Sequence, residues 1–207
     1  MNLREYTSNS SELLKSISQS DRSETHQVSL LGLNWDTQRD TLTIKFSPVQ
    51  ESSSKVTRRL MLKFVASFFD PLGLLSPVFL RAKSFLQLKS ELMKDWDDPL
   101  PRELVPEWNA LTTEIATANS IEIPRTSSTS DGRTFELICF TDASALAYCA
   151  TVYLKSLGQT STRTALVFAK VRLAPVRIVT IPRLELVGIL IGVRTLDYVE
   201  KELGLQI

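Results

Sequence analysis

The sequence predicts an α+β protein in which a β-hairpin and a helical region precede three antiparallel strands and a final helix. Residues 135–154, FELICFTDASALAYCATVYL, contain two apolar runs of strand length joined by a short link, as in a hairpin. Leu60, Phe64 and Phe68 recur at four-residue steps, which is the spacing of an amphipathic helix. Residues 124–133, PRTSSTSDGR, have no strongly apolar side chain and therefore predict a boundary between the helices and the strands.

The amino-terminal part of the chain predicts a short helix and then a hairpin. Ser10 stands where a helix N-cap is expected, before an apolar pattern that ends at Ile17. The runs 28–35 (VSLLGLNW) and 41–46 (TLTIKF) have strand character and flank the polar sequence DTQRD. Gly32, inside the first run, predicts a bulge or the close approach of another backbone.

The middle of the chain predicts three helices. The first opens at Thr57, covers residues 57–69 and ends at the helix-breaking sequence DPLG. The second has Ser76 as its N-cap and Pro77 in its first turn, and continues to about residue 94. A turn, DWDDPLP, leads to the third. Its apolar face consists of Trp108, Leu111, Ile115 and Ala118.

The carboxyl-terminal part predicts three strands, at 135–142, 148–154 and 163–172, followed by a helix over 181–204 that Thr180 caps. Both faces of the first strand carry apolar side chains, so we expect that strand to be buried.

Charge is distributed unevenly along a chain whose net charge is only +1. Between residues 55 and 94 the net charge is +6. This excess predicts a polyanionic partner such as nucleic acid, and a solvated cationic face is the alternative. The basic residues of the segment are Lys55, Arg58, Arg59, Lys63, Arg81, Lys83, Lys89 and Lys94.

Several functional classes are excluded by composition. No apolar run is long enough to span a bilayer and residues 1–10 lack a signal peptide, so we expect a cytoplasmic or nuclear location and no membrane partner. Cys139 and Cys149 fall in predicted strands without metal-binding spacing and need not be bridged. Because His26 is the only histidine, His-based zinc sites and Ser-His-Asp triads are excluded.

Two carboxylates stand in positions that suggest chemistry. Asp142 closes the apolar strand 135–142, where an acid commonly holds a metal ion, although it could simply begin a turn.

Glu185 is the second carboxylate, inside the sequence LELVGILIGV. Because this segment is apolar on nearly every side, we expect a buried helix. Glu185, Gly188 and Gly192 are spaced i, i+3 and i+7, so they share a face that can approach a sheet closely. An ionised carboxylate there predicts a bound cation. The alternatives are a salt bridge to Arg183 or Arg194, or a side chain close enough to the helix start to reach water.

Three antiparallel strands, an Asp at the end of the first and a helix carrying a Glu form the start of a ribonuclease H fold. The sequences FTDASALAYCATVYL and LVFAKVRLAPVRIVTIPRLELVGIL resemble the ribonuclease H segment of BEL/Pao-type LTR retrotransposon polyproteins. LLGLNWDTQRDTL, TRRLMLKFVASFFDPLGLLSPVFLRAKSFLQ and DWDDPLP resemble the same polyprotein just upstream. The order FFDPLGLLSPV, TDAS, IPRLEL is the specific part of the resemblance.

The resemblance implies a set of site residues. Asp142 and Glu185 match the first two carboxylates of the family's catalytic metal site, which takes two Mg²⁺ ions in the intact domain for hydrolysis of the RNA strand. A primer–template duplex or an RNA–DNA hybrid is then the expected partner, together with the rest of the Pol polyprotein. Nucleic-acid contacts are expected from Arg58, Arg59, Lys63, Arg81, Lys83, Arg172 and Arg183.

The resemblance also implies four segments. Residues 1–54 would end a reverse transcriptase palm with a primer-grip-like hairpin, and 55–123 would form a helical thumb and connection. Residues 124–134 would be a linker, and 135–207 the amino-terminal part of a ribonuclease H-like domain.

Departures from the family pattern limit the expected activity. The polymerase's paired Asp motif is absent. Asp97 and Asp98 cannot replace it, because they lie in a turn before a helix. The last two ribonuclease H carboxylates also do not appear before Ile207. We therefore expect a polyprotein fragment that is inactive alone. One alternative is a non-catalytic module that binds nucleic acid or protein. Another is a Pao-type aspartic peptidase, but its Asp-Thr/Ser-Gly sequence is absent: Asp142 precedes Ala143, and Asp131 directly precedes Gly132.

Overall fold

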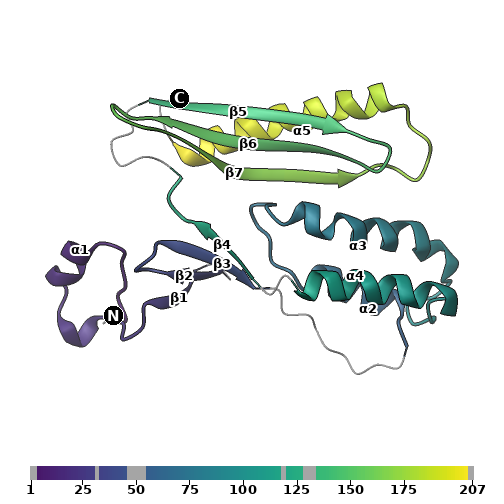
Figure 1. Cartoon of the computed structure of the whole chain (residues 1–207), viewed down its shortest axis with the longest axis horizontal. Helices are drawn as coiled ribbons and strands as arrows, with labels where there is room; N and C mark the ends of the chain where they lie inside the picture. The colour runs from purple at the N-terminus through teal and green to yellow at the C-terminus, as the bar shows by residue number, and fades with distance from the viewer. Residues whose placement is uncertain (1–3, 31–32, 46–54, 118–119, 128–133, 205–207) are drawn as a thin grey trace. The chain divides into compact units, whose positions relative to one another are not determined.

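The computed structural model describes residues 4–30, 33–45, 55–117, 120–127 and 134–204 (Figure 1). These residues form five α-helices and two antiparallel sheets, one of four strands and one of three, so the predicted mixed α+β class is confirmed. The chain divides into two compact units. The first comprises Met1–Phe46 with Ala118–Thr126, and the second comprises Ser47–Thr117 with Ser127–Ile207.

The first unit contains a short helix and the four-stranded sheet. Helix α1 (Ser11–Ser16) begins as predicted, because the Ser10 hydroxyl accepts a hydrogen bond from the amide of Leu13 at 3.3 Å. The sheet has the order β1-β2-β3-β4. Its strands are β1 (Gln27–Leu30), β2 (Leu33–Asp36), β3 (Thr41–Lys45) and β4 (Ser120–Pro124).

The predicted hairpin is present between β2 and β3, but the prediction of one strand over 28–35 is wrong. That stretch forms two strands, since β1 pairs antiparallel with β2 and Leu30 lies opposite Leu33. The expected feature at Gly32 lies outside the described residues. Sequence reasoning also missed β4, although Ile121 and Ile123 alternate with polar residues there.

Asp40 fastens the end of β4 to the turn between β2 and β3. Its carboxylate accepts hydrogen bonds from the Arg125 guanidinium at 2.6 and 3.1 Å, from the Thr126 hydroxyl at 2.6 Å and from the Trp35 indole at 3.0 Å. These bonds, with the Arg125 guanidinium foremost, lower the pKa of Asp40 from its usual 3.8 to about 2. The cluster therefore joins residues far apart in sequence.

The helices of the second unit are α2 (Arg58–Ala66), α3 (Ser76–Lys89) and α4 (Val105–Thr117). Thr57 caps α2 as predicted, whereas Ser76 is not the cap of α3. The Asp70 carboxylate instead accepts from the amide of Leu75 at 2.9 Å, just before α3 begins. Burial raises the pKa of Asp70. The helices share an aromatic core made of Phe64, Phe68, Phe79, Phe85 and Trp108.

The three-stranded sheet has the order β5-β6-β7. Its strands are β5 (Thr134–Ala143), β6 (Ala147–Leu157) and β7 (Thr162–Leu173). Helix α5 (Ile181–Leu203) runs along one face of this sheet (Figure 1). Gly204 ends it in the left-handed conformation, with φ of 58°.

One face of α5 packs on the sheet and the other is exposed. The buried residues Leu184, Gly188, Gly192, Thr195 and Val199 form a stripe at helical spacing. Leu186, Ile189, Leu190 and Val193 are each about half exposed or more. The prediction of a helix buried on all sides is therefore wrong, because a single sheet layer covers it within the described residues. The β5 strand is likewise open on one face, where Phe140 is 60% exposed.

The sequence DPLG, between α2 and α3, docks on the outer edge of β7. The Ala169 amide donates a hydrogen bond of 2.8 Å to the carbonyl of Leu72. Gly73, with φ of 72°, lies directly against the carbonyl of Ala169. The side-chain amide of Gln87 also donates to the carbonyl of Ala174 at 3.0 Å. The helical region and the sheet of the second unit are thus in direct contact.

Candidate functional site

Asp142 lies at the carboxyl-terminal end of β5, where it pairs in register with Cys149 of β6. Its side chain is exposed. Cys139 and Thr141 contact α5, so the alternation along the strand directs Asp142 to the opposite face of the sheet. Its backbone carbonyl nevertheless contacts the helix, which places this acid at the junction of β5 with α5.

Glu185 lies on the second turn of α5, close to this junction. Three residues later, Gly188 packs against β5: a β-carbon built there would lie 3.5 Å from the Asp142 carbonyl oxygen. Glu185 is about 60° around the helix from Gly188, since successive residues turn by about 100°. The helix therefore brings Glu185 and Asp142 to the same end of the sheet. Glu185 is exposed, so the expectation of a buried carboxylate is wrong, and the alternative that its side chain reaches water near the start of the helix agrees with the structure.

Both carboxylates are available to bind a cation. Among the described residues, neither side chain of Asp142 and Glu185 has a hydrogen-bond or ion-pair partner. Salt bridges from Glu185 to Arg183 or Arg194, one of the two alternatives considered from the sequence, do not form within the described part of the chain. Carboxylate oxygens are hard donors, and Mg²⁺ is commonly held by one or two of them together with water and phosphate. Asp142 and Glu185 therefore offer two exposed oxygen donors of the kind that Mg²⁺ takes, at the same end of the sheet.

Residues 57–207 match the family model described as the Pao retrotransposon-like RNaseH-like domain. The chain belongs to this family. No curated protein matches the chain. The match begins at the cap of α2 and includes both carboxylates, so the helical region and the sheet fall within one family segment.

A cluster of three or more His, Cys, Asp or Glu side chains able to hold a metal is not found among the residues that the structure describes in this RNaseH-like domain. Asp97 and Asp98 lie in a turn, as expected, and Asp97 is paired with Arg59. Asp131 and Gly132, considered for a peptidase motif, lie outside the described residues. In the described residues, no helix is both long and apolar enough to cross a membrane.

The structure brings together two of the cations predicted to contact nucleic acid. Arg58 and Lys83 line one groove of about 440 Å³ between α2, α3 and the end of β7. Trp96 lies in the same groove, and the Arg58 guanidinium is 4.4 Å from the centre of its ring. A cation beside an exposed aromatic ring is a combination that nucleic-acid-binding surfaces use.

Two other predicted cations of the Pao RNaseH-like domain are already paired. Arg59 forms a bidentate ion pair with Asp97, at 2.7 and 2.9 Å, and Arg81 contacts Glu114 at 2.7 Å. Lys63 lies exposed on α2, apart from the groove lining. Pairing with a carboxylate reduces the attraction that Arg59 and Arg81 exert on phosphate.

The remaining two predicted cations lie near α5. Arg183 is exposed in its first turn, two residues before Glu185. Arg172 of β7 lines a crevice with Lys170 and Arg194. From the sequence, Lys170 and Arg194 were counted among the basic residues on the expected hybrid side, but not among the assigned nucleic-acid contacts. Lys170 and Arg172 are two residues apart on one strand, so their side chains point to the same face. This spacing was the sequence signal for a cationic surface there.

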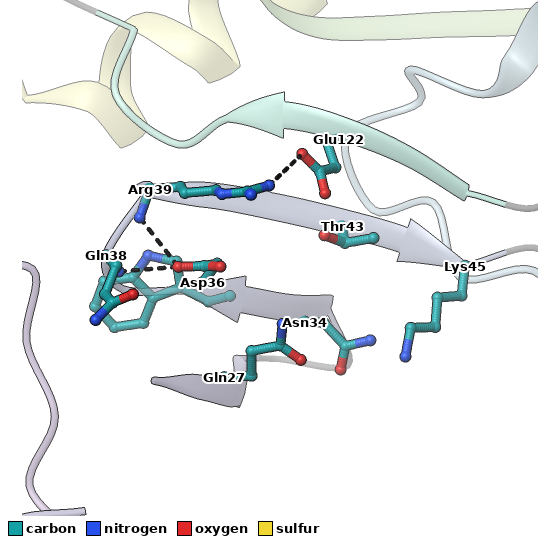
Figure 2. Close-up of a pocket in the computed structure, with 9 residues that line it drawn as sticks. Gln27, Asn34, Asp36, Gln38, Arg39, Thr43, Lys45 and Glu122 are labelled. Carbon is teal, nitrogen blue, oxygen red and sulfur yellow. Dashed lines mark hydrogen bonds and ion pairs between the residues drawn. The ribbon is translucent and has the colours of Figure 1, made fainter. Parts of the chain in front are cut away.

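A second pocket lies on the polar face of the four-stranded sheet in the first unit, and Glu122 is the one residue of its lining that falls within the family match. Its volume is about 420 Å³ (Figure 2). Arg39 reaches across it to Glu122, 3.9 Å away, while Asp36 accepts hydrogen bonds from the amides of the following turn. The other labelled side chains in Figure 2 are Gln27, Asn34, Gln38, Thr43 and Lys45. The pocket therefore combines neutral hydrogen-bonding side chains with charged ones of both signs.

Proposed function

We propose that this chain binds an RNA–DNA hybrid or primer–template duplex, with Asp142 and Glu185 as the metal-binding carboxylates of its ribonuclease H-like site. The observation that carries the proposal is the contact of Gly188 with the Asp142 backbone, which brings the two acids to one end of the sheet. In the proposed site, Asp142 and Glu185 would hold and orient Mg²⁺, which would supply the positive charge that ribonuclease H chemistry needs to activate water and to neutralise the phosphate.

Two carboxylates are sufficient for a weakly held ion but not for a pair of ions, whose concentrated positive charge needs more acids around it. We therefore propose that the chain by itself binds hybrid and does not cleave it. Cleavage would require further carboxylates around the metal ions.

The cationic helical region supports the duplex-binding part of the proposal. Arg58 and Lys83 share a groove with Trp96, and phosphate contacts of this kind give affinity independent of sequence. We assign this region the role of a thumb and connection. The hairpin of β2 and β3 then corresponds to a primer grip, whose polar face offers Asn34 and Thr43 to sugar and phosphate oxygens.

The metal site can be tested by titrating the full chain with Mg²⁺ and following backbone amide resonances. Shifts are expected around Asp142 and Glu185, and either Asp142→Asn or Glu185→Gln should abolish them. Glu202→Gln removes an exposed acid from the same helix and should leave them unchanged. Identical titrations for all three variants would exclude the two acids as the metal site.

Hybrid binding needs a separate measurement, because it tests the other half of the proposal. Fluorescence anisotropy with a labelled RNA–DNA hybrid should show binding in buffer without Mg²⁺, weakening as salt increases. No binding at low salt would refute the proposal. Cleavage of the RNA strand on addition of Mg²⁺, lost in Asp142→Asn, would overturn the assignment of an inactive chain.

The second candidate function is a module that binds hybrid without any metal role. The exposed cations of α2, α3 and β7 favour it, since they do not depend on Asp142. Hybrid binding combined with an unchanged Mg²⁺ titration in Asp142→Asn would select this function.

A further inference from the structure

A crevice on one side of α5 has no part in the proposed metal site. It lies between α5, β7 and Pro71 of the DPLG sequence, and its volume is about 520 Å³. This is within the size range of small-molecule sites. The residues of its lining that carry charge or an aromatic ring are Phe168, Lys170, Arg172, Arg194 and Tyr198.

The charge in this crevice is all of one sign. Lys170 and Arg172 project from the helix-covered face of β7, and Arg194 faces them from α5. Among the described residues, none of these three side chains has a carboxylate partner, and no acidic residue lines the crevice. Three unpaired cations around a concave surface attract an anion, and phosphate is the anion that such groups hold most strongly.

The crevice also has an aromatic wall. The rings of Phe168 and Tyr198 meet edge to face with centres 5.8 Å apart, and Tyr198 is 51% exposed. Ile191 and Pro71 add apolar surface. An exposed tyrosine beside cations can stack a nucleobase while the cations hold its phosphate.

Helical geometry separates this crevice from the carboxylates. Glu185 and Arg194 are nine residues apart, so they lie on opposite sides of α5 and about 14 Å apart along its axis. Gly192 and Thr195 are buried against the sheet between these two sides. A ligand in the crevice therefore does not reach the proposed metal site.

We propose that the crevice binds a nucleotide, with its phosphate between Lys170, Arg172 and Arg194 and its base against Tyr198. The same chemistry is offered by a free nucleotide and by one nucleotide of a single-stranded nucleic acid. The site goes beyond the proposed function, because it requires neither Mg²⁺ nor a duplex.

The test is calorimetric titration of the full chain with four probes: inorganic phosphate, adenosine, adenosine monophosphate and a short single-stranded oligonucleotide. The monophosphate should bind more tightly than phosphate or adenosine, since only it uses both parts of the crevice. Arg194→Gln should weaken its binding about tenfold, as expected for loss of a charge-assisted hydrogen bond. Tyr198→Leu should weaken binding of the monophosphate and leave phosphate unaffected.

Control variants show whether a loss of nucleotide binding is specific to the crevice. Lys94→Gln removes the same charge from an exposed position outside the crevice and should have no effect. Lys170→Gln removes a crevice cation from β7, so it provides the same test if Arg194→Gln on α5 does not fold. Tighter binding of the oligonucleotide than of the monophosphate, with competition between the two, would identify single-stranded nucleic acid as the ligand of the crevice. Equal affinities for Arg194→Gln, Lys170→Gln and the unchanged chain would overturn the proposal, as would failure of all four probes to bind. Asp142→Asn should leave these titrations unchanged, so the metal site and the crevice can fail independently.

Discussion

Gly188 of α5 faces the backbone carbonyl oxygen of Asp142, and a β-carbon built on this glycine would lie 3.5 Å from that oxygen. This is ordinary van der Waals contact. One turn further, Gly192 is more crowded: a β-carbon there would overlap the methyl group of Thr141 and lie 3.3 Å from the Cys139 sulfur. The sheet therefore leaves space for a β-carbon at Gly188 but not at Gly192.

Alanine at these positions should have opposite effects on stability. Gly188→Ala should raise the free energy of unfolding by about 0.5–1 kcal/mol, because alanine favours the helix and the space is available. Gly192→Ala should lower it by about 1–3 kcal/mol through overpacking against β5. Urea unfolding followed by circular dichroism measures both. Equal stabilisation in the two variants would show that the contact at Gly192 is not tight.

Docking of the DPLG sequence on β7 can be tested at Gly73. Gly73→Ala should be strongly destabilising, by about 3 kcal/mol or more, because it combines a left-handed backbone with an overlap onto the Ala169 carbonyl. Gly204→Ala is the matched control, since it has a φ of 58° and open space around it. It should cost only about 1 kcal/mol. Similar losses in thermal denaturation would mean that the docking contact contributes little.

The two faces of α5 should respond differently to truncation. Leu184 is 3% exposed and Leu186 is 65% exposed. Leu184→Ala should cost about 2–4 kcal/mol, because it opens a cavity against the sheet. Leu186→Ala should change the free energy of unfolding by less than about 0.5 kcal/mol. A large loss at Leu186 in denaturant titration would indicate that another surface covers this face in solution.

Acid should weaken the Asp40 cluster of the first unit. Because the folded pKa of about 2 lies below the usual 3.8, the stabilisation is present above about pH 4 and is lost as the pH falls towards 2. Its size is on the order of 2 kcal/mol, at about 1.4 kcal/mol per tenfold change in acid dissociation. Asp40→Asn should lower stability at pH 7 and remove this acid dependence. The fluorescence of Trp35, whose indole bonds Asp40, reports the change. An unchanged pH profile in Asp40→Asn would rule out this carboxylate as its origin.

Whether a cation is already ion-paired with a carboxylate should determine how strongly it contributes to hybrid binding. Arg58 lies in the groove with Trp96, whereas Arg81 is paired with Glu114. Arg58→Gln should weaken hybrid binding several-fold and reduce its salt dependence by about one phosphate contact. Arg81→Gln removes the same charge and should have a smaller effect. Anisotropy titrations at several salt concentrations compare them, and a larger effect at Arg81 would contradict this order.

Local patterns were sufficient for most elements. The four-residue spacing of Leu60, Phe64 and Phe68 predicted α2, and the capping residues Ser10 and Thr57 predicted helix starts correctly. These features depend on neighbours within a turn or a strand, so they can be interpreted without the fold. The strand β4 was missed because its pairing with β3 joins residues almost eighty positions apart.

By itself, the sequence determined which stretches form α5 and the strands β5 to β7, and which two acids follow the family pattern. It did not determine what covers them. Glu185 is exposed because only one side of α5 meets the sheet, and burial depends on packing partners that periodicity cannot specify. The same holds for the crevice of Lys170, Arg172 and Arg194, since the packing of α5 against β7 brings a helix cation to two strand cations.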